Sequence, residues 1–203
     1  MTLTHLNMIK YFITIIIILV TLTVNSQTWK SYTTQDNINI EYLRDNKKKM
    51  FFVKINAKTN HTIDQLLDNI NDVENYNQWV SYTTETKMIK KYGNDSLFYY
   101  TINQPPFPLG KKDAIFGVYL NYKNDGSVHI YSKSLPDKLP KVDGYDRVDY
   151  YIVIWEFIPK QDYTLIKYYL ELEYPPISTE FILSQFIRKG PEESIRKFIA
   201  KMK

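Results

Sequence analysis

The chain has 203 residues, no cysteine and a formal net charge of +4, from 26 basic and 22 acidic residues. Without cysteine it has no disulfide, no thiolate nucleophile and no cysteine metal ligand. The net charge is too small to indicate a nucleic-acid partner. The 18 tyrosines and 10 phenylalanines favour a β-rich body, because aromatic residues suit half-buried pleated surfaces.

Residues 1–26 have the order of a secretory signal peptide. One lysine precedes an apolar run over 11–24, and Val24 and Ser26 occupy the positions that favour cleavage after Ser26. The run is shorter than the roughly 20 residues that a membrane-spanning helix needs. We therefore predict export, to the periplasm or the medium, of one mature domain over 27–203. The alternative is an uncleaved N-terminal anchor.

The mature chain begins with a predicted β-hairpin. Apolar and polar residues alternate over 38–42 and 51–57, on either side of a polar turn at 45–48. The period then changes to that of a helix over 63–70, which Thr62 can cap, and a second short helical turn ends at Trp79.

A meander of six strands is predicted next. Its segments are 83–91, 96–102, 113–122, 127–135, 147–158 and 164–174. The last segment alternates most clearly, which places Tyr168, Leu170 and Leu172 on one buried face.

The remainder is predicted to be helical from a cap at Ser178. Gly190-Pro191 indicates a kink or a fresh start, because proline removes a helix hydrogen bond. The polar face is basic and carries Arg188, Lys189, Arg196, Lys197, Lys201 and Lys203. We favour an ordinary solvated face; the alternative is that this face and the loop 105–110 make transient contact with anionic lipid.

Three local patterns occur along the chain in a fixed order. They are Asp-Val-Glu-Asn-Tyr-Asn-Gln-Trp-Val at 72–80; Leu-Phe-Tyr-Tyr at 97–100 with Pro-Pro-Phe-Pro-Leu-Gly-Lys-Lys-Asp at 105–113; and Arg147 with Trp155 and Pro159. Together they resemble the START domains, here a bacterial exported member, within the START-like (helix-grip, Bet v 1-like) superfamily. Phe107 and Lys112 stand where that family has tryptophan and arginine, and Tyr174–Ser178 lacks its aspartate and glycine.

The resemblance implies an α+β helix-grip fold in the order β-β-α-α-β6-α. A curved antiparallel β-sheet would wrap around a long C-terminal α-helix, with a largely apolar tunnel between them for a lipid or sterol-like molecule. Large aromatics suit an amphipathic ligand. The candidate ligand-binding residues are Trp79, Tyr99, Phe116, Tyr131, Arg147, Trp155, Tyr168, Leu170 and Phe186.

Asp113 and Arg147 each open an otherwise apolar predicted strand. Buried charges are tolerated when they are paired, so we expect the two to face each other, or neighbouring strands, at one end of the tunnel. Arg147 then either meets the polar head of a ligand or forms a structural ion pair, and we favour the ion pair.

No nucleophile-elbow, phosphate-loop, dinucleotide or histidine metal motif is present. The leading hypothesis is therefore a monomeric module without cofactor or metal that binds or carries a hydrophobic small molecule: a lipid, a sterol-like molecule or an aromatic one. One alternative is a cyclase- or aromatase-type enzyme that uses the same pocket. Another is an exported interaction domain with a filled core.

Overall fold

The computed structural model describes residues 28–34, 36, 38–174, 179–183, 186 and 188–201. The predicted signal peptide (1–26) and the predicted helix cap at Ser178 lie outside these residues. Within the described part of the chain, no helix is both long enough and apolar enough to cross a membrane.

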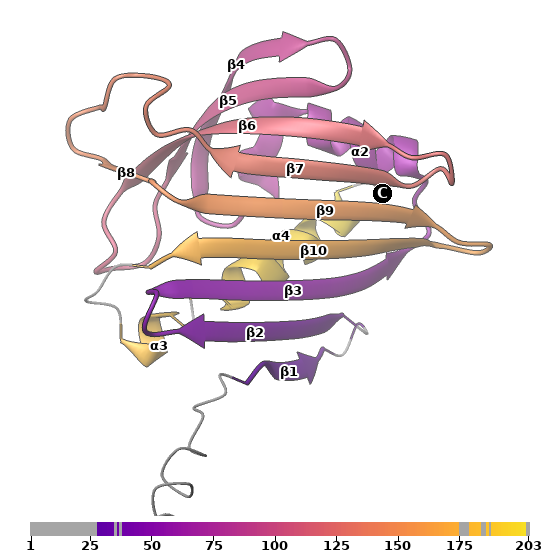
Figure 1. Ribbon diagram of the computed structural model, residues 1–203, viewed down its shortest axis with the longest axis horizontal. Coiled ribbons are helices and arrows are strands. Elements are labelled where there is room, and N and C mark those ends of the chain that lie inside the picture. The colour runs from indigo at the N-terminus through magenta and orange to yellow at the C-terminus, as the bar shows by residue number, and fades with distance from the viewer. Residues whose placement is uncertain are drawn as a thin grey trace, which may run out of the picture.

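The described strands form one ten-stranded curved sheet (Figure 1). Their bounds are β1 Lys30–Thr33, β2 Asn39–Asp45, β3 Met50–Thr59, β4 Thr83–Tyr92, β5 Ser96–Asn103, β6 Lys112–Tyr122, β7 Val128–Ser134, β8 Asp146–Arg147, β9 Tyr151–Pro159 and β10 Thr164–Glu173. The order across the sheet is β1-β2-β3-β10-β9-β7-β6-β5-β4, with antiparallel neighbours. The exception is β8, which pairs in parallel with β6.

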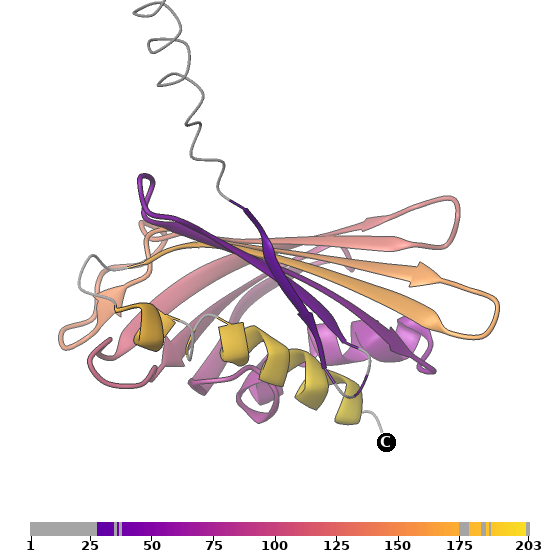
Figure 2. The same cartoon turned by 90° about the horizontal axis from the view of Figure 1, so that it is seen from below.

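The helices lie together on one side of the sheet (Figure 2). They are α2 (Ile63–Asn71), the 3₁₀ helix η1 (Val73–Gln78), α3 (Glu180–Leu183) and α4 (Lys189–Ala200). A capping box starts α2: the Thr62 hydroxyl accepts from the backbone of Gln65, whose side chain accepts from the backbone of Thr62. Gly190 and Pro191 lie in the first turn of α4, where a proline costs no helix hydrogen bond. α4 begins at Lys189, one residue before Gly190, so a helix boundary lies at the predicted kink or fresh start.

The curved antiparallel sheet with a C-terminal helix agrees with the expected fold, whereas the element order differs from the expected one. β1 adds an edge strand, and two separate helices, α3 and α4, occupy the C-terminal region. The predicted strand 147–158 is divided into β8 and β9. β7 ends at Ser134 opposite Phe116, and β8 takes the place beside β6 beyond that end. Because β9 pairs with β7 and β10, the chain has to leave β6 to begin β9.

An aromatic cluster fixes the helices to the sheet. The Phe198 ring of α4 lies 4.9 Å from Trp79, which follows η1, and 5.0 Å from Trp155 of β9, between ring centroids. Phe157, the next inward residue on β9, stacks on Phe198 at 6.1 Å. Phe157 and Phe198 are fully buried. The cluster therefore fills one part of the concave face and anchors α4 there.

Candidate ligand-binding cavity

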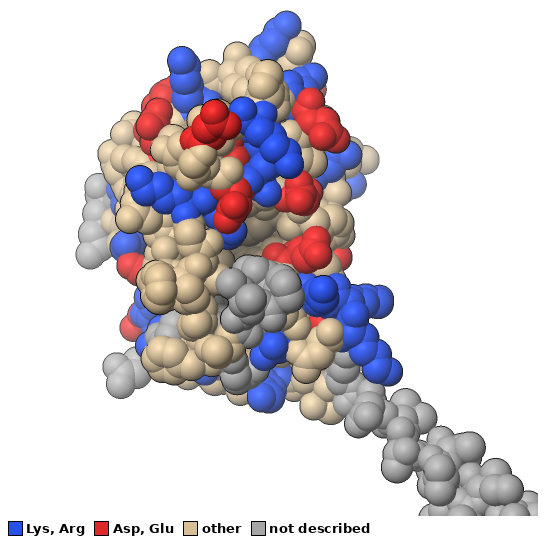
Figure 3. Space-filling model, turned by 90° about the vertical axis from the view of Figure 1, so that its left-hand side faces the viewer, with Lys and Arg blue, Asp and Glu red and all other residues tan. Residues whose placement is uncertain are grey.

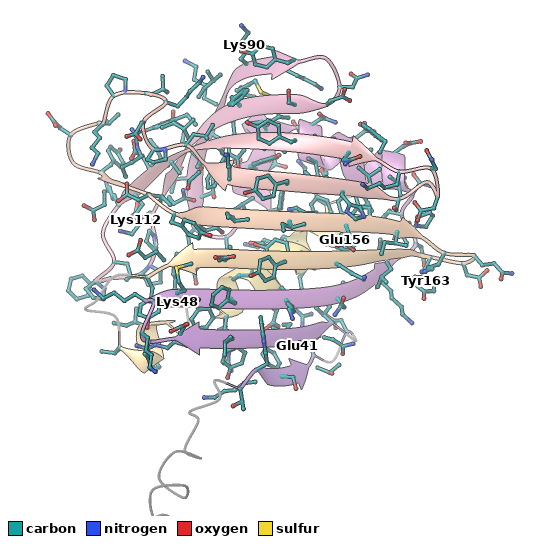
Figure 4. The ribbon with its side chains drawn as sticks, viewed as in Figure 1. Glu41, Lys48, Lys90, Lys112, Glu156 and Tyr163 are labelled. Carbon is teal, nitrogen blue, oxygen red and sulfur yellow. The ribbon has the colours of Figure 1, made fainter. Side chains whose placement is uncertain are left out.

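The other part of the concave face borders an internal cavity of about 200 Å³. Its walls come from β5, β6, β9 and β10, from the segment after η1 and from the first turn of α4. Lys112, Tyr150 and Glu173, where β6 and β9 begin and β10 ends, border it, and Lys112 is labelled at that edge in Figure 4. Figure 3 shows this end of the molecule, which is hollowed and carries charged side chains of both signs. The cavity therefore has an interior among the strands and a mouth at their ends.

The interior wall is mostly apolar. Because side chains alternate across a strand, each wall strand presents every second residue to the cavity. These residues include Ala114, Phe116 and Val118 of β6, Val153 and Trp155 of β9, and Leu170 and Leu172 of β10. Ile70, Tyr76 and Trp79 close the wall from the helix side. Contact between such a surface and an apolar molecule is favourable, because it removes apolar area from water.

Three phenols interrupt the apolar wall. Tyr99, Tyr151 and Tyr168 come from β5, β9 and β10, and burial raises the pKa of each, that of Tyr151 to about 12. Tyr99 and Tyr151 nevertheless keep some exposed area, which fits side chains that face an internal space. All three hydroxyls stay protonated at neutral pH and are available for hydrogen bonds.

Seven of the nine candidate residues lie around the cavity. They are Trp79, Tyr99, Phe116, Trp155, Tyr168, Leu170 and Phe186. The inward placement of Tyr168, Leu170 and Leu172 on the last strand is confirmed by their burial. Sequence reasoning missed Tyr151, although Tyr151, Val153 and Trp155 alternate on β9 and share a face. Strand parity taken from Trp155 would have found it.

Tyr131 does not lie at the cavity, so its choice was wrong. It is 37% exposed and stands opposite Tyr119 and Ile154 on the outer face. The inward residues of β7 are Val128, Ile130 and Ser132, so Tyr131 has the other parity. Figure 4 views this outer face, on which Glu41 and Glu156 are labelled.

The chain was compared with known proteins by sequence and by structure. No family model matches the chain. It is 24% identical over 175 residues to the uncharacterized protein PA1579 of Pseudomonas aeruginosa, which covers 84% of this chain and 85% of that protein. Among solved structures, a STAR-related lipid transfer protein from Xanthomonas axonopodis has a TM-score of 0.78 at 15% identity, covering 86% of this chain and 98% of that one.

Two human structures extend the comparison. STARD10 has a TM-score of 0.71 at 14% identity over 86% of this chain and 72% of its own. StAR-related lipid transfer protein 5 has a TM-score of 0.68 at 10% identity over 90% of this chain and 89% of its own. This chain has the START-like fold. The resemblance expected from the three sequence patterns is therefore confirmed at the level of fold.

In this START-like fold, Arg147 and Asp113 pair as expected. Arg147 Nε donates to Asp113 Oδ1 and Nη2 donates to Oδ2, both at 2.8 Å, and both side chains are only 1% exposed. The hydrogen bonds from Arg147 hold the pKa of Asp113 below its ordinary value, although burial opposes this. The Tyr100 hydroxyl also donates to Asp113, at 3.2 Å. The pair is thus bidentate, buried and charged at neutral pH.

Arg147 is not among the residues that line the cavity. Its remaining donors go to the chain itself: Nη1 to the carbonyls of Pro136 and Leu139, and Nη2 to that of Pro140. A guanidinium has five N–H groups, and these five hydrogen bonds use them all. The ligand-head role considered for Arg147 therefore has no free donor to support it, and the ion pair with its loop contacts is structural.

Of the predicted basic face, Lys203 lies outside the described residues, and Arg196, Lys197 and Lys201 have acidic partners. Arg196 contacts Glu192 and Asp36, Lys197 lies 2.6 Å from Glu193, and Lys201 lies 2.9 Å from Asp72. The guanidinium of Arg188 lies over the rings of Tyr32 and Tyr42. These contacts favour a structural role for this helix face over that of a free cationic surface.

We predict that Arg147→Met lowers the free energy of unfolding by about 3–5 kcal/mol at pH 7 and leaves ligand occupancy unchanged, because it strands the buried Asp113 carboxylate. In the wild type the pair contributes its full stability at pH values above the ordinary aspartate pKa. This contribution is lost as the pH falls through the lowered pKa of Asp113. In the variant, protonation of Asp113 removes an unpaired buried charge and so stabilises the fold. The difference in unfolding free energy between wild type and variant therefore becomes smaller at acidic pH. Urea unfolding at several pH values measures it.

Lys112→Met is the matched control, because Lys112 makes a surface ion pair with Asp146 at 3.4 Å. Such pairs contribute about 0–1 kcal/mol. Loss of ligand from Arg147→Met at unchanged stability would contradict the structural role.

Proposed function

We propose that this domain binds or carries a hydrophobic small molecule in its internal cavity, outside the cytoplasm. The observation that carries the proposal is the largely apolar, aromatic-lined cavity between the sheet and α4. At about 200 Å³ it exceeds engineered apolar cavities of about 150 Å³, which already bind benzene. The Xanthomonas axonopodis neighbour and human StAR-related lipid transfer protein 5 are named as lipid transfer proteins, which supports a lipid, a sterol-like molecule or an aromatic one.

The chemistry of the wall supports binding better than cyclase- or aromatase-type catalysis. Among the described residues that line the cavity, the charged ones are Lys112 and Glu173, both at the mouth. The interior phenols have pKa values raised by burial and so stay protonated at neutral pH. A general base needs a pKa near the working pH, which these groups lack. The cavity itself also speaks against an interaction domain with a filled core.

The extracytoplasmic location is supported by the signal-peptide pattern of residues 1–26. If the segment is cleaved after Ser26, the mature protein begins at Gln27. A native mass spectrum of the intact exported protein reports the cleavage site, the oligomeric state and a bound molecule at once, so it tests the expected cleavage and the expected monomeric state together.

We expect native mass spectrometry of the protein purified from its own host to show one hydrophobic molecule per chain. Val153→Phe should lower occupancy at least tenfold, because Val153 lines the cavity and a larger ring fills it. Ile154→Phe is the matched control, because Ile154, the next residue on β9, points to the outer face. Equal occupancy in both variants would contradict binding in the cavity. A retained N-terminal segment would contradict cleavage.

Transient membrane contact is the second part of the proposal. Phe107, in the loop between β5 and β6, is 94% exposed, while its loop neighbours Pro105 and Leu109 line the cavity. The loop and α3 lie at the same end of the sheet in both views (Figures 1 and 2). Lys111 and Lys112 follow the loop and supply positive charge. An apolar tip beside lysines suits the surface of an anionic membrane, with the cavity mouth close by.

Phe107→Ser should reduce binding to vesicles of phosphatidylglycerol and phosphatidylcholine several-fold at low salt, because the exposed ring is the apolar part of the contact. Tyr122→Ser is the control: Tyr122 is 49% exposed at the end of β6, away from the mouth. Flotation of the vesicles measures binding. If wild type fails to float even at low salt, the membrane proposal is wrong, while cavity binding stands.

A further inference from the structure

The hydroxyl groups around the cavity are gathered rather than scattered. Tyr99 stacks on Phe116 with ring centroids 5.3 Å apart, and Phe116 meets Tyr151 edge-on at 5.4 Å. Tyr168 packs edge-on against Trp155 at 4.8 Å. The pKa of Tyr99 is affected by Tyr151, and that of Tyr168 by both Tyr151 and Tyr99. Three strands thus place their phenols in one region of an otherwise apolar wall.

The hydroxyl groups of Tyr99 and Tyr151 can still donate hydrogen bonds in this region. Tyr151 and Tyr168 influence each other's pKa, and Ser132 lowers that of Tyr99, so these hydroxyls lie close to one another. A phenol that accepts one hydrogen bond still has its own O–H to donate. Among the hydrogen bonds recorded for the described residues, none takes the O–H of Tyr99 or Tyr151.

A third donor belongs to the same wall. Trp79 is 4% exposed and lines the cavity, and its indole Nε1 has no hydrogen-bond partner within the described chain. The Trp79 ring lies 4.9 Å from Tyr76, which in turn lies 5.2 Å from Tyr99. A buried donor without an acceptor costs free energy. The Trp79 nitrogen is enclosed, whereas Tyr99 and Tyr151 keep exposed area at the cavity, so a bound molecule reaches the two hydroxyls.

The surroundings of these donors restrict the charge of such an acceptor. The pKa values of Tyr99, Tyr151 and Tyr168 are shifted by burial and by neighbouring hydroxyl groups. No lysine or arginine contributes to these shifts. The lining lysine, Lys112, lies at the mouth and faces Asp146 at 3.4 Å. A carboxylate or phosphate buried beside the phenols would have no cation to offset its desolvation.

We propose that the molecule held in this cavity is uncharged at its buried end and carries a carbonyl, hydroxyl or ether oxygen that accepts hydrogen bonds from Tyr99 and Tyr151. The proposal rests on the proposed binding function and deepens it. An amphipathic compound with a small neutral polar group fits, whereas a molecule whose ionised head has to enter the cavity does not.

The first test uses prodan, a naphthalene dye with a ketone carbonyl whose emission moves to longer wavelength when the carbonyl accepts hydrogen bonds. Bound to the wild type, it should emit at longer wavelength than when bound to Tyr99→Phe/Tyr151→Phe. Its Kd should rise about fivefold for each hydroxyl removed. Tyr131→Phe is the matched control, because it removes an outer-face hydroxyl. Thermal unfolding confirms that the variants fold, and the single variants serve if the double variant does not.

The second test displaces prodan with decan-2-one, decanoate and decane at pH 7. Decan-2-one should displace the dye from wild type at the lowest concentration, and its advantage over decane should shrink in the double variant. Stronger displacement by decanoate, or unchanged emission and Kd in the double variant, would overturn the neutral-acceptor proposal while leaving cavity binding intact. Failure of the dye and of every competitor to bind wild type would contradict the binding function itself.

Discussion

The packing of Phe198 against Trp79 and Trp155 determines where the cavity of this protein lies. α4 has 12 residues and is therefore about 18 Å long, whereas the ten-residue strand β10 extends over about 33 Å. One helix of that length cannot cover the concave face from end to end. Because the aromatic cluster fills one part of that face, the cavity lies in the other part, beside the first turn of α4. Trp79 and Trp155, which belong to this core, thus also line the cavity.

The charges of the protein are arranged so that the cavity interior stays neutral. Arg147 and Asp113 neutralise each other, and the surplus donors of Arg147 bind the 136–140 loop rather than face the cavity. Lys112 and Glu173 lie at the mouth. What remains inside is a set of aromatic rings with a few hydroxyls. Under the proposed binding function, a polar group of the ligand is therefore recognised by hydrogen bonds rather than by ion pairing.

Strand periodicity in the sequence was enough to predict most of the wall and not its polar details. The alternation of β10 placed Tyr168 and Leu170 correctly, whereas Tyr131 was chosen for its aromatic character against the parity of Ile130. The pairing of Arg147 with Asp113 followed from the cost of isolated buried charges. The carbonyls that complete the Arg147 site come from a loop without periodicity, and their approach depends on tertiary structure. The same holds for the break between β8 and β9.

A START-like fold at 10–15% identity says little about what the cavity binds, because the same backbone accepts many different linings. The chemistry of the ligand has to be deduced from side chains that this chain places on the shared frame. Under the proposed binding function, the apolar wall favours hydrophobic molecules, and the hydroxyls of Tyr99 and Tyr151 add a condition that a pure hydrocarbon does not meet. Selectivity among hydrophobic molecules then depends on a few buried hydrogen bonds, since the apolar contacts are similar for all of them.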